Sequence, residues 1–600
     1  MTSEASGTAD IEIDVEALNK RYAEERAKRL RSEANAQYTR LEGKFADFDK
    51  DIYADPNFTR AAVDEQLDVL IIGGGFAGLL TAIRLRERGI ENFRIIERGA
   101  DVGGTWYWNR YPGAASDVEG YIYLPMLEEL GYLPSQKYSP APEIHAHCQK
   151  LAKHFDLYPK ALFQTRVTGD AQWDEESSRW LVTTHRGDKF AARFLISCTG
   201  TYDSPKLPNI AGAETFEGHA FHTSRWDYNY TGGNSLGGLD KLGDKVVGVI
   251  GTGATAVQCI PHLAASAKHL YVFQRTPSSV DVRNQKKTDP EWAKSLKPGW
   301  QWERTKNFTS LTSGEPVTED LVDDGWTDIA RNIGAAVGGD SEGPQDFALS
   351  GLKKMEMARR RIDSIVKDKE TAEALKPYYA YFCKRPCFHD DYLPVFNQPN
   401  VTLVDTKGIG VEQITPKGVV AAGKEYPVDC LVYATGFEFM TEFVKQTGYD
   451  LVGRGGRKLS EHWSQGARTL WGIQTSGFPN FFLMALNQSG VGVNYVHMAT
   501  EQTAHFAYVI DECLKKGIAS IEVSKEAQDD WVEKVLAAAE EGGRNAFLDS
   551  CTPSHYNHEG KKAESARLND LYAGGPGDYL KRLEAWRAAG TMPGFHVTPA

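Results

Sequence analysis

Two glycine-rich turns in this 600-residue chain have the form that binds the pyrophosphate of a dinucleotide. The first, Gly73-Gly74-Gly75-Phe76-Ala77-Gly78, follows the apolar run Leu67 to Ile72 and opens a helical stretch from Leu79 to Arg88. In this G-x-G-x-x-G pattern the glycines permit a tight turn, a close approach of backbone to pyrophosphate, and close packing of helix on strand. The next apolar run, Phe93 to Ile96, ends on Glu97, whose carboxylate can accept ribose hydroxyls and disfavours a 2′-phosphate. The first turn therefore predicts FAD or NAD rather than NADP.

The second turn differs from the first in the residue that discriminates between cofactors. It reads G-x-G-x-x-A at Gly251-Thr252-Gly253-Ala254-Thr255-Ala256, after the apolar run Lys245 to Ile250. The following run, Leu270 to Phe273, ends on Gln274-Arg275-Thr276 instead of an acid. A guanidinium at that point can hold the 2′-phosphate of NADP through bidentate hydrogen bonds. Two such sites in one chain imply that electrons pass from one cofactor to the other.

Further residues suited to flavin chemistry lie outside the two turns. Gly104 and Thr105 are followed by three aromatic side chains, Trp106, Tyr107 and Trp108, and the segment ends at Asp117. Flat aromatic side chains can wall an isoalloxazine ring. Much later in the chain, Lys384 and Arg385 form an adjacent pair of cations flanked by apolar residues. This pair has two interpretations, a packing arginine at a domain junction or a group that stabilises negative charge during a reaction.

Four short motifs occur in a characteristic order. Gly104 to Asp117 read G-x-W-x-x-x-R-Y-P-G-x-x-x-D, and Phe216 to Asp227 read F-x-G-x-x-x-H-T-x-x-W-D between the two turns. The Lys384-Arg385 pair and the run Ala434-Thr435-Gly436 follow. This order resembles that of type I Baeyer–Villiger monooxygenases, over roughly residues 20–590. The resemblance implies an enzyme that uses FAD and NADPH to insert one oxygen of O2 beside a ketone carbonyl, through a C4a-peroxyflavin, giving an ester or lactone.

The resemblance also implies roles for particular residues. Arg385 is the expected catalytic guanidinium, and Asp117 is expected to orient it and to contact the flavin. The other expected FAD contacts are Gly73, Gly75, Phe76, Ala77, Gly78, Glu97, Gly104, Thr105, Trp106, Tyr107, Trp108, Tyr123 and Gly436. The expected NADP contacts are Gly251, Thr252, Gly253, Ala254, Thr255, Ala256, Arg275, Thr276 and Lys384.

Three segments indicate a branch of the family. RYAEERAKRLR from Arg21, CKRPCFHDDYLP from Cys383 and CTP-x-x-Y-N-x-E-G from Cys551 are most similar to the cyclododecanone and cyclopentadecanone monooxygenases. This similarity implies large cyclic or bulky ketones as substrates. His555 stands where many members have a tryptophan that contacts the nicotinamide ribose, and His222 of the linker motif can be a structural histidine.

The expected fold class is α/β, with two Rossmann-type dinucleotide-binding domains, a helical insertion and an N-terminal extension. The extension is expected over residues 1–65 and is mostly helical. The FAD domain is expected over 66–205 and 390–600, with a helical C-terminal region. The NADP domain is expected over 206–389 and includes a charged helical insertion at 285–375, interpreted as a solvated face that caps this domain.

Composition restricts the partners. The formal net charge of −13 argues against nucleic acid and anionic membrane surfaces, and the chain has no long apolar run that could span a membrane. The polar, acidic N-terminus has no signal-peptide character, and the eight cysteines are interpreted as reduced thiols of a cytoplasmic protein. No metal site is expected. The expected partners are a small-molecule ketone and O2, and the chain is expected to be a monomer or a small homo-oligomer.

Other classes of protein explain the pattern less well. A flavin-dependent N- or S-hydroxylating monooxygenase shares the two dinucleotide sites and is the alternative function. A pyridine nucleotide–disulfide reductase needs a C-x4-C pair near the flavin, and no cysteine lies between Gly99 and Asp117. A flavin-binding protein without enzymatic activity would not need the second, NADP-type turn.

Overall fold

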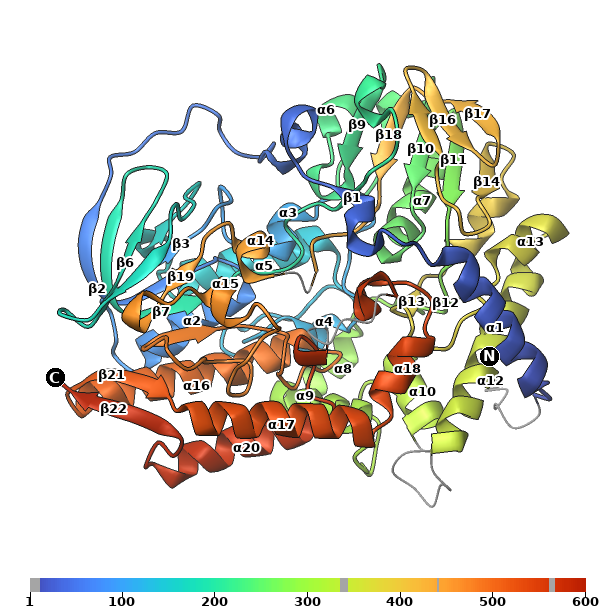
Figure 1. Cartoon of the computed structure of the whole chain (residues 1–600). Helices are drawn as coiled ribbons and strands as arrows, with labels where there is room; N and C mark the ends of the chain where they lie inside the picture. Colours follow the sequence, from blue (N-terminus) through green and yellow to red (C-terminus); the bar gives the residue numbers. More distant parts are fainter. Residues whose placement is uncertain (1–10, 335–343, 440–441, 561–566) are drawn as a thin grey trace.

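Two large sheets form the body of the protein (Figure 1). The computed structural model describes residues 11–334, 344–439, 442–560 and 567–600. In the larger sheet the strands run in the order β19-β5-β6-β7-β2-β3-β4, and β20 pairs with β7. Their bounds are β2 (Asp64–Ile72), β3 (Phe93–Ile96), β4 (Ala161–Leu162), β5 (Ala171–Asp174), β6 (Arg179–Thr183), β7 (Lys189–Ser197), β19 (Leu451–Val452) and β20 (Phe481–Leu483). This sheet carries the first glycine-rich turn.

The second sheet is parallel throughout and carries the second turn. Its order is β14-β11-β10-β18-β9. The bounds are β9 (His219–His222), β10 (Val246–Ile250), β11 (His269–Gln274), β14 (Val401–Asp405) and β18 (Cys430–Tyr433). An antiparallel meander of β15 (Gln413–Thr415), β16 (Gly418–Ala421) and β17 (Lys424–Pro427) lies between β14 and β18 along the chain. The sequence-based boundary at residue 390 is therefore wrong, because β14 and β18 extend the NADP-side sheet by pairing with β11 and β10.

Each glycine-rich turn joins a buried strand to a helix. β2 leads into α2 (Phe76–Glu87), and β10 leads into α7 (Ala254–Ser266). Gly73 and Gly251 have φ values of 108° and 110°, which glycine adopts without strain. A Cβ on Gly78 would lie 1.9 Å from the carbonyl oxygen of Gly73, so only glycine permits this approach of helix to strand. Both turns thus have the geometry that their sequence patterns predict.

The N-terminal segment crosses the NADP side of the molecule. α1 (Val15–Arg29) lies beside α12 (Pro344–Ile365) and α13 (Lys369–Leu375) of the insertion (Figure 1). There the guanidinium of Arg359 on α12 donates to the hydroxyl of Tyr22 on α1. η2 (Ala34–Gln37) and η3 (Gly43–Asp49) flank β1 (Tyr38–Thr39), which pairs with β8 (Leu207–Pro208). The extension is therefore bound to the crossover between the two sheets.

The C-terminal region is mainly helical, and it covers the larger sheet. α16 (Tyr495–Lys515) packs against α2. It is followed by β21 (Ile518–Val523), α17 (Lys525–Glu541), α18 (Arg544–Ser550), η11 (His555–Gly560), α20 (Gly575–Ala589) and β22 (Phe595–Pro599). None of the described helices combines the length and the apolar character that a membrane crossing requires.

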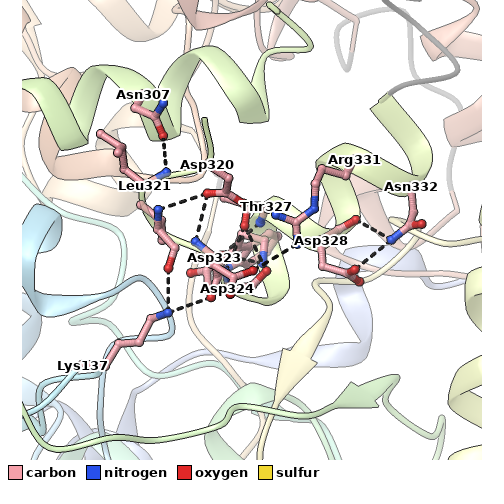
Figure 2. Close-up of polar contacts among 12 residues, drawn as sticks. Lys137, Asn307, Asp320, Leu321, Asp323, Asp324, Thr327, Asp328, Arg331 and Asn332 are labelled. Atoms are coloured by element: carbon pink, nitrogen blue, oxygen red, sulfur yellow. Dashed lines mark hydrogen bonds and ion pairs between the residues drawn. The ribbon is translucent and has the colours of Figure 1, made fainter. Parts of the chain in front are cut away.

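The insertion is helical, and several aspartates form polar contacts around its helix α10 (Gly325–Ile329) (Figure 2). Its elements are α8 (Pro290–Ser295), α9 (Trp300–Thr312), α10 (Gly325–Ile329), η8 (Ala330–Gly334), α12 (Pro344–Ile365) and α13 (Lys369–Leu375). Asp324 caps α10 by accepting the backbone N–H groups of Trp326 and Thr327, each at 2.9 Å. Lys137 donates to the backbone carbonyls of Val322 and Asp323 in the preceding loop. These polar contacts fix α10 relative to the segment that contains Lys137.

The face of α12 that the sequence suggested was solvated is partly buried. Lys354 is 4% exposed and forms ion pairs with Asp281 and Asp328 at 2.8 and 2.7 Å. Arg359 is also buried and donates to the backbone carbonyl of Pro377. The expectation of a solvated face is wrong for these two residues, because pairing allows their charges to be buried between packed elements.

Two of the eight cysteines form a disulfide. Cys383 and Cys551 are bonded, with their Cα atoms 5.1 Å apart. The other six are free and buried. The expectation that all eight are reduced thiols is therefore wrong for this pair. The bond joins the residue before Lys384 to the start of the C-terminal segment 551–560.

Candidate active site

A cavity of about 1800 Å³ contains the candidate site. Its wall is formed by the N-terminal extension, the segment before Asp117, the second glycine-rich turn, the insertion and the segment around His555. A single small-molecule pocket usually measures about 300–1,000 Å³. This cavity therefore has room for more than one molecule.

Arg385 and Asp117 meet in this cavity although 268 residues separate them. Arg385 Nε donates to Asp117 Oδ2 at 3.1 Å, and Nη2 donates to Oδ1 at 2.8 Å. Burial lowers the pKa of Arg385, but Asp117 and Tyr556 outweigh it and hold the pKa above its usual range. The structure thus gives the cavity a permanently cationic group in a fixed orientation, with Nη1 outside the pair.

Two aromatic residues that sequence reasoning missed hold this pair in place. Trp326 of α10 donates from Nε1 to the backbone carbonyl of Asp117 at 3.1 Å, and its ring centre lies 5.1 Å from the guanidinium carbon of Arg385. Tyr556 of the C-terminal segment lies beside Arg385 on the cavity wall. One signal for Trp326 was available in the sequence, an isolated tryptophan within the acidic stretch from Asp320 to Asp328.

The first turn and the end of β3 form a backbone cradle. The Oε2 and Oε1 atoms of Glu97 each accept one backbone N–H, from Gly74 and Gly99, both at 2.6 Å. Burial raises the pKa of Glu97, and these two N–H groups lower it. A Cβ on Gly104 would lie 2.8 Å from the Cα atom of Gly75, so backbone faces backbone with no room for a side chain. Together with the helix N-terminus at Phe76, Ala77 and Gly78, this arrangement fits the dinucleotide part of FAD.

Several of the other expected flavin contacts line the cavity. They are Thr105, Trp106, Asp117, Tyr123 and Gly436. Trp106 Nε1 donates to the hydroxyl of Tyr123 at 3.1 Å, so the two rings support each other at the wall.

Tyr107 and Trp108 point away from this wall. The hydroxyl of Tyr107 donates to Asp51 Oδ2 at 2.7 Å, and the ring of Trp108 stacks under the guanidinium of Arg225, whose carbon lies 4.2 Å from the ring centre. All three aromatics lie on the single turn α3 (Thr105–Trp108), where successive side chains are about 100° apart. Of the three aromatics only Trp106 lines the cavity, and the flavin contacts expected of Tyr107 and Trp108 stay predictions.

The second turn opens directly onto the cavity. The residues Gly251, Thr252, Gly253, Ala254 and Thr255 line it, whereas Ala256 is buried in the packing of α7. No atom lies within 4 Å of the position that a Cβ on Gly253 would take. This open backbone at a helix N-terminus fits the pyrophosphate of NADP.

The polar residues expected to bind NADP line the same cavity. Arg275 and Thr276 follow the carboxyl end of β11, and Lys384 comes from a later segment. Arg275 Nη1 donates to Gln37 Oε1 at 2.8 Å, and Lys384 Nζ donates to the carbonyl of Pro553 at 3.1 Å. Burial, reinforced by the charge of Arg275, lowers the pKa of Lys384 to about 8. These groups fit a 2′-phosphate.

Two histidines of the family motifs are neutral at physiological pH. His222 is fully buried, with Nδ1 2.9 Å from the Ser224 hydroxyl, and burial lowers its pKa to about 3. His555 lines the cavity, its ring centre lies 4.9 Å from that of Phe439, and burial lowers its pKa to about 3 as well. His222 thus has the surroundings of a structural histidine.

Comparison with known proteins identifies the family. A family model described as pyridine nucleotide-disulphide oxidoreductase matches residues 70–310. Neopentalenolactone D synthase of Streptomyces avermitilis is 52% identical over 588 residues, covering 96% of this chain and 98% of that protein. Baeyer-Villiger monooxygenase ATR8 of Stachybotrys chlorohalonatus is 49% identical over 606 residues, covering 99% and 96%. The structure of the polycyclic ketone monooxygenase from Thermothelomyces thermophila superposes with a TM-score of 0.90 at 38% identity, covering 97% and 99%.

These similarities span nearly the whole chain, including both dinucleotide sites and the insertion. They favour a Baeyer–Villiger monooxygenase over the flavin-dependent N- or S-hydroxylating alternative. The chain therefore belongs to the type I Baeyer–Villiger monooxygenases, and it uses FAD, NADPH and O2 to insert one oxygen atom beside a ketone carbonyl, giving an ester or lactone.

Proposed function

We propose that the substrate is a polycyclic ketone, which the enzyme converts to a lactone. The observation that carries this proposal is the agreement with the polycyclic ketone monooxygenase over 97% of this chain. The lactone synthase at 52% identity supports a cyclic product. The cavity of about 1800 Å³ offers room for a bulky ketone beside two cofactors. The three branch motifs suggested large cyclic or bulky ketones, of which the large monocyclic ketones are the narrower alternative.

Two sets of residues hold the cofactors in this proposal. FAD is held by Gly73, Gly75, Phe76, Ala77, Gly78, Glu97, Gly104, Thr105, Trp106, Asp117, Tyr123 and Gly436. NADPH is held by Gly251, Thr252, Gly253, Ala254, Thr255, Ala256, Arg275, Thr276 and Lys384. When bound, the two cofactors supply hydride transfer and the activation of O2.

The protein's own chemical task is to stabilise negative charge. Addition of an oxygen nucleophile to the ketone places negative charge on the carbonyl oxygen. Arg385 remains cationic, and Asp117 fixes the plane of its guanidinium, so Nη1 can donate to that oxygen. Trp326 fixes Asp117 in turn by donating to its backbone carbonyl. Removing one preorganised donor of this kind typically lowers kcat about 10²- to 10³-fold.

The substrate class can be tested with the purified enzyme, FAD, NADPH and isotopically labelled O2. The ketones would be a steroid ketone, a fused bicyclic ketone, cyclododecanone, cyclopentadecanone and cyclohexanone. We expect one labelled oxygen in a lactone from the polycyclic ketones, with the highest kcat/KM among the panel. A higher kcat/KM for cyclododecanone or cyclopentadecanone than for every polycyclic ketone would contradict the proposed substrate class.

A further inference from the structure

Four cationic side chains converge on the cavity at the carboxyl end of β11. Arg275 follows β11, and Lys384 is the residue before Arg385. Lys206 is the residue before β8, and Arg31 belongs to the N-terminal extension. All four line the cavity. In a dinucleotide-binding fold this end of the second strand is where the 2′-position of the adenosine ribose lies.

The N-terminal extension is anchored on both sides of this site. Arg29 Nε donates to Thr276 Oγ1 at 3.1 Å and to the carbonyl oxygen of Arg275 at 3.2 Å. Eight residues later, Gln37 Oε1 accepts from Arg275 Nη1 at 2.8 Å. Arg31 lies between these two contacts along the chain. The extension therefore holds Arg31 on the same wall as Arg275.

Arg31 and Arg275 flank a third segment of that wall. Arg31 Nη2 donates to the carbonyl of Ile409. A Cβ on Gly410 would lie 3.1 Å from Arg31 Nη2 and 3.7 Å from Arg275 Cδ. The absence of a side chain at Gly410 lets the two arginines approach each other. Burial lowers the pKa of Arg31, and the charge of Arg275 lowers it further.

The two lysines of this group differ from Arg275 in how their charges are paired. Among the described residues, neither Lys206 nor Lys384 has a carboxylate oxygen within ion-pair distance of its ammonium. The ammonium of Lys206 lies 3.9 Å from the ring centre of Tyr38, and burial lowers its pKa. Like charges held together in a cavity without partners raise the free energy of the protein unless an anion binds there.

One buried carboxylate faces these cations. Glu559 is 5% exposed, and its Oε1 accepts from the Tyr38 hydroxyl at 2.9 Å. Its Oε2 lies 3.6 Å from Arg275 Nη2 and has no hydrogen-bond partner among the described residues. Burial raises the pKa of Glu559, but Arg275, Lys206 and Lys384 lower it below its usual value. Glu438 also faces Lys206, but it is already paired with Lys445 at 2.9 Å.

We propose that Arg31 and Lys206 complete the binding site for the 2′-phosphate of NADPH, and that Glu559 opposes this phosphate and limits its affinity. The inference rests on the placement of that phosphate at Arg275 and Lys384 proposed above. A phosphate monoester carries about 1.5 to 2 negative charges at pH 7, which balances cations that the protein leaves unpaired. NADH has an uncharged hydroxyl at the same position. The N-terminal extension therefore contributes to the preference for NADPH over NADH.

The main test compares the affinities of NADP⁺ and NAD⁺ for the FAD-loaded enzyme by titration calorimetry. We expect Arg31→Ala to weaken NADP⁺ binding about tenfold, as for one lost hydrogen bond between charged groups, and to leave NAD⁺ binding unchanged. Lys206→Met keeps the aliphatic stem against Tyr38 and is expected to act in the same direction. The matched control is Arg40→Ala, because Arg40 lies on the same extension with its side chain 85% exposed. This control should bind both nucleotides as the parent enzyme does.

Glu559→Gln is expected to change the affinity for NADP⁺ in the opposite direction. The amide has the size of the carboxylate but no charge, so we expect NADP⁺ to bind several-fold more tightly and NAD⁺ to bind as before. If Glu559 only supported the fold, its substitution would instead weaken the binding of both nucleotides. Weaker binding of NADP⁺ by Glu559→Gln, or equal weakening of both nucleotides by Arg31→Ala, would overturn the inference.

Arg275→Ala separates this inference from the placement on which it rests. If Arg275→Ala selectively weakens NADP⁺ and Arg31→Ala does not, the phosphate lies at Arg275 and the extension has no part in binding it. If neither variant affects NADP⁺, the phosphate lies elsewhere, and the proposed NADP site itself is wrong. Binding of 2′,5′-ADP, which has the phosphate but no nicotinamide, should follow NADP⁺ in every variant.

Discussion

The insertion contains an aspartate cluster (Asp320, Asp323, Asp324 and Asp328), and the cavity wall carries a cation cluster (Arg31, Lys206, Arg275 and Lys384). The two clusters differ in how their charges are paired. In the first, the carboxylate of Asp320 pairs with Arg331, both labelled in Figure 2, and the carboxylate of Asp328 pairs with Lys354 of α12. In the second, Arg31, Lys206, Arg275 and Lys384 face a single buried carboxylate, that of Glu559. Asp320 and Asp328 of the first cluster thus have cationic partners, whereas in the described part of the chain Arg31, Lys206 and Lys384 of the second have no carboxylate partner.

This difference indicates how a structural cluster can be told from a binding site. Paired charges such as Lys354 with Asp328 fix one segment against another, and they leave nothing for a ligand to neutralise. Unpaired like charges on a cavity wall store unfavourable energy that a ligand can release. Changes in the first cluster should therefore alter folding, and changes near the second should alter binding and turnover.

Arg385→Ala is expected to give the largest effect. Loss of the cavity's fixed cation should lower the rate of ester formation about 10²- to 10³-fold, while NADPH oxidation continues. Ester yield measured by mass spectrometry and NADPH absorbance measured in parallel would show this uncoupling. Arg331→Ala, in the aspartate cluster, should change neither rate. Ester formation at the parent rate in Arg385→Ala would show that this guanidinium does not stabilise the oxyanion.

Cys551→Ser should affect both stability and nucleotide binding. The disulfide closes a loop with a sequence separation of 168 residues, and loss of such a crosslink typically lowers the free energy of unfolding by about 2–4 kcal/mol. The bond also holds Cys383 and therefore the neighbouring Lys384 in place on the cavity wall, so NADP⁺ should bind more weakly without it. Thermal unfolding with and without a reductant measures the first effect. The reductant should destabilise the parent enzyme and leave Cys551→Ser unchanged; an equal shift in both would exclude this bond as the cause.

Asp324 should make the free energy of unfolding depend on pH. Burial raises the pKa of its carboxyl group to about 7, Glu119 raises it, and Lys137 and two backbone N–H groups lower it. Between about pH 4 and pH 7 the folded state therefore holds a proton that the unfolded state has lost. This contribution to stability is complete below the unfolded pKa of about 3.9 and disappears as the pH rises through 7, with a slope of about 1.4 kcal/mol per pH unit.

Asp324→Asn should remove that slope. The amide oxygen can still cap α10, and the variant should gain stability relative to the parent as the pH rises from 5 to 8. Denaturant unfolding at several pH values measures the difference. Asp323→Asn is the control, because the side chain of Asp323 is 83% exposed and should leave the slope unchanged. A parent-like slope in Asp324→Asn would place the titrating group elsewhere.

Local patterns allowed the two dinucleotide turns to be predicted from sequence. Glu97 and Arg275 each follow the strand that comes after a glycine-rich turn. Only a short stretch of chain separates each residue from its turn, so its position could be predicted from local sequence. The meeting of Arg385 with Asp117 was expected because both lie in family motifs.

The features that could not be predicted from sequence are contacts between distant segments and the direction in which a helix points each side chain. The Cys383–Cys551 bond and the place of Glu559 beside Arg275 join segments far apart in the chain. Tyr107 lies next to Trp106, yet the turn of α3 directs it away from the cavity. The boundary at residue 390 was misplaced because an apolar strand such as β18 can pair with either sheet until its neighbours are known.

Trp326→Phe should give the smallest effect. It tests whether α10 of the insertion contributes to the reaction as well as to the stability of the fold. The aromatic ring is retained, whereas the indole N–H that holds the carbonyl of Asp117 is lost, which corresponds to about 0.5–1.5 kcal/mol. We expect ester formation to fall roughly 2- to 10-fold, and the ester formed per NADPH consumed to fall with it. Trp302→Phe is the control, because Trp302 is half-exposed on α9 of the same insertion. A lower melting temperature with unchanged ester per NADPH would assign Trp326 to the fold alone; a lower ratio at an unchanged melting temperature would show that α10 positions Asp117 for the reaction.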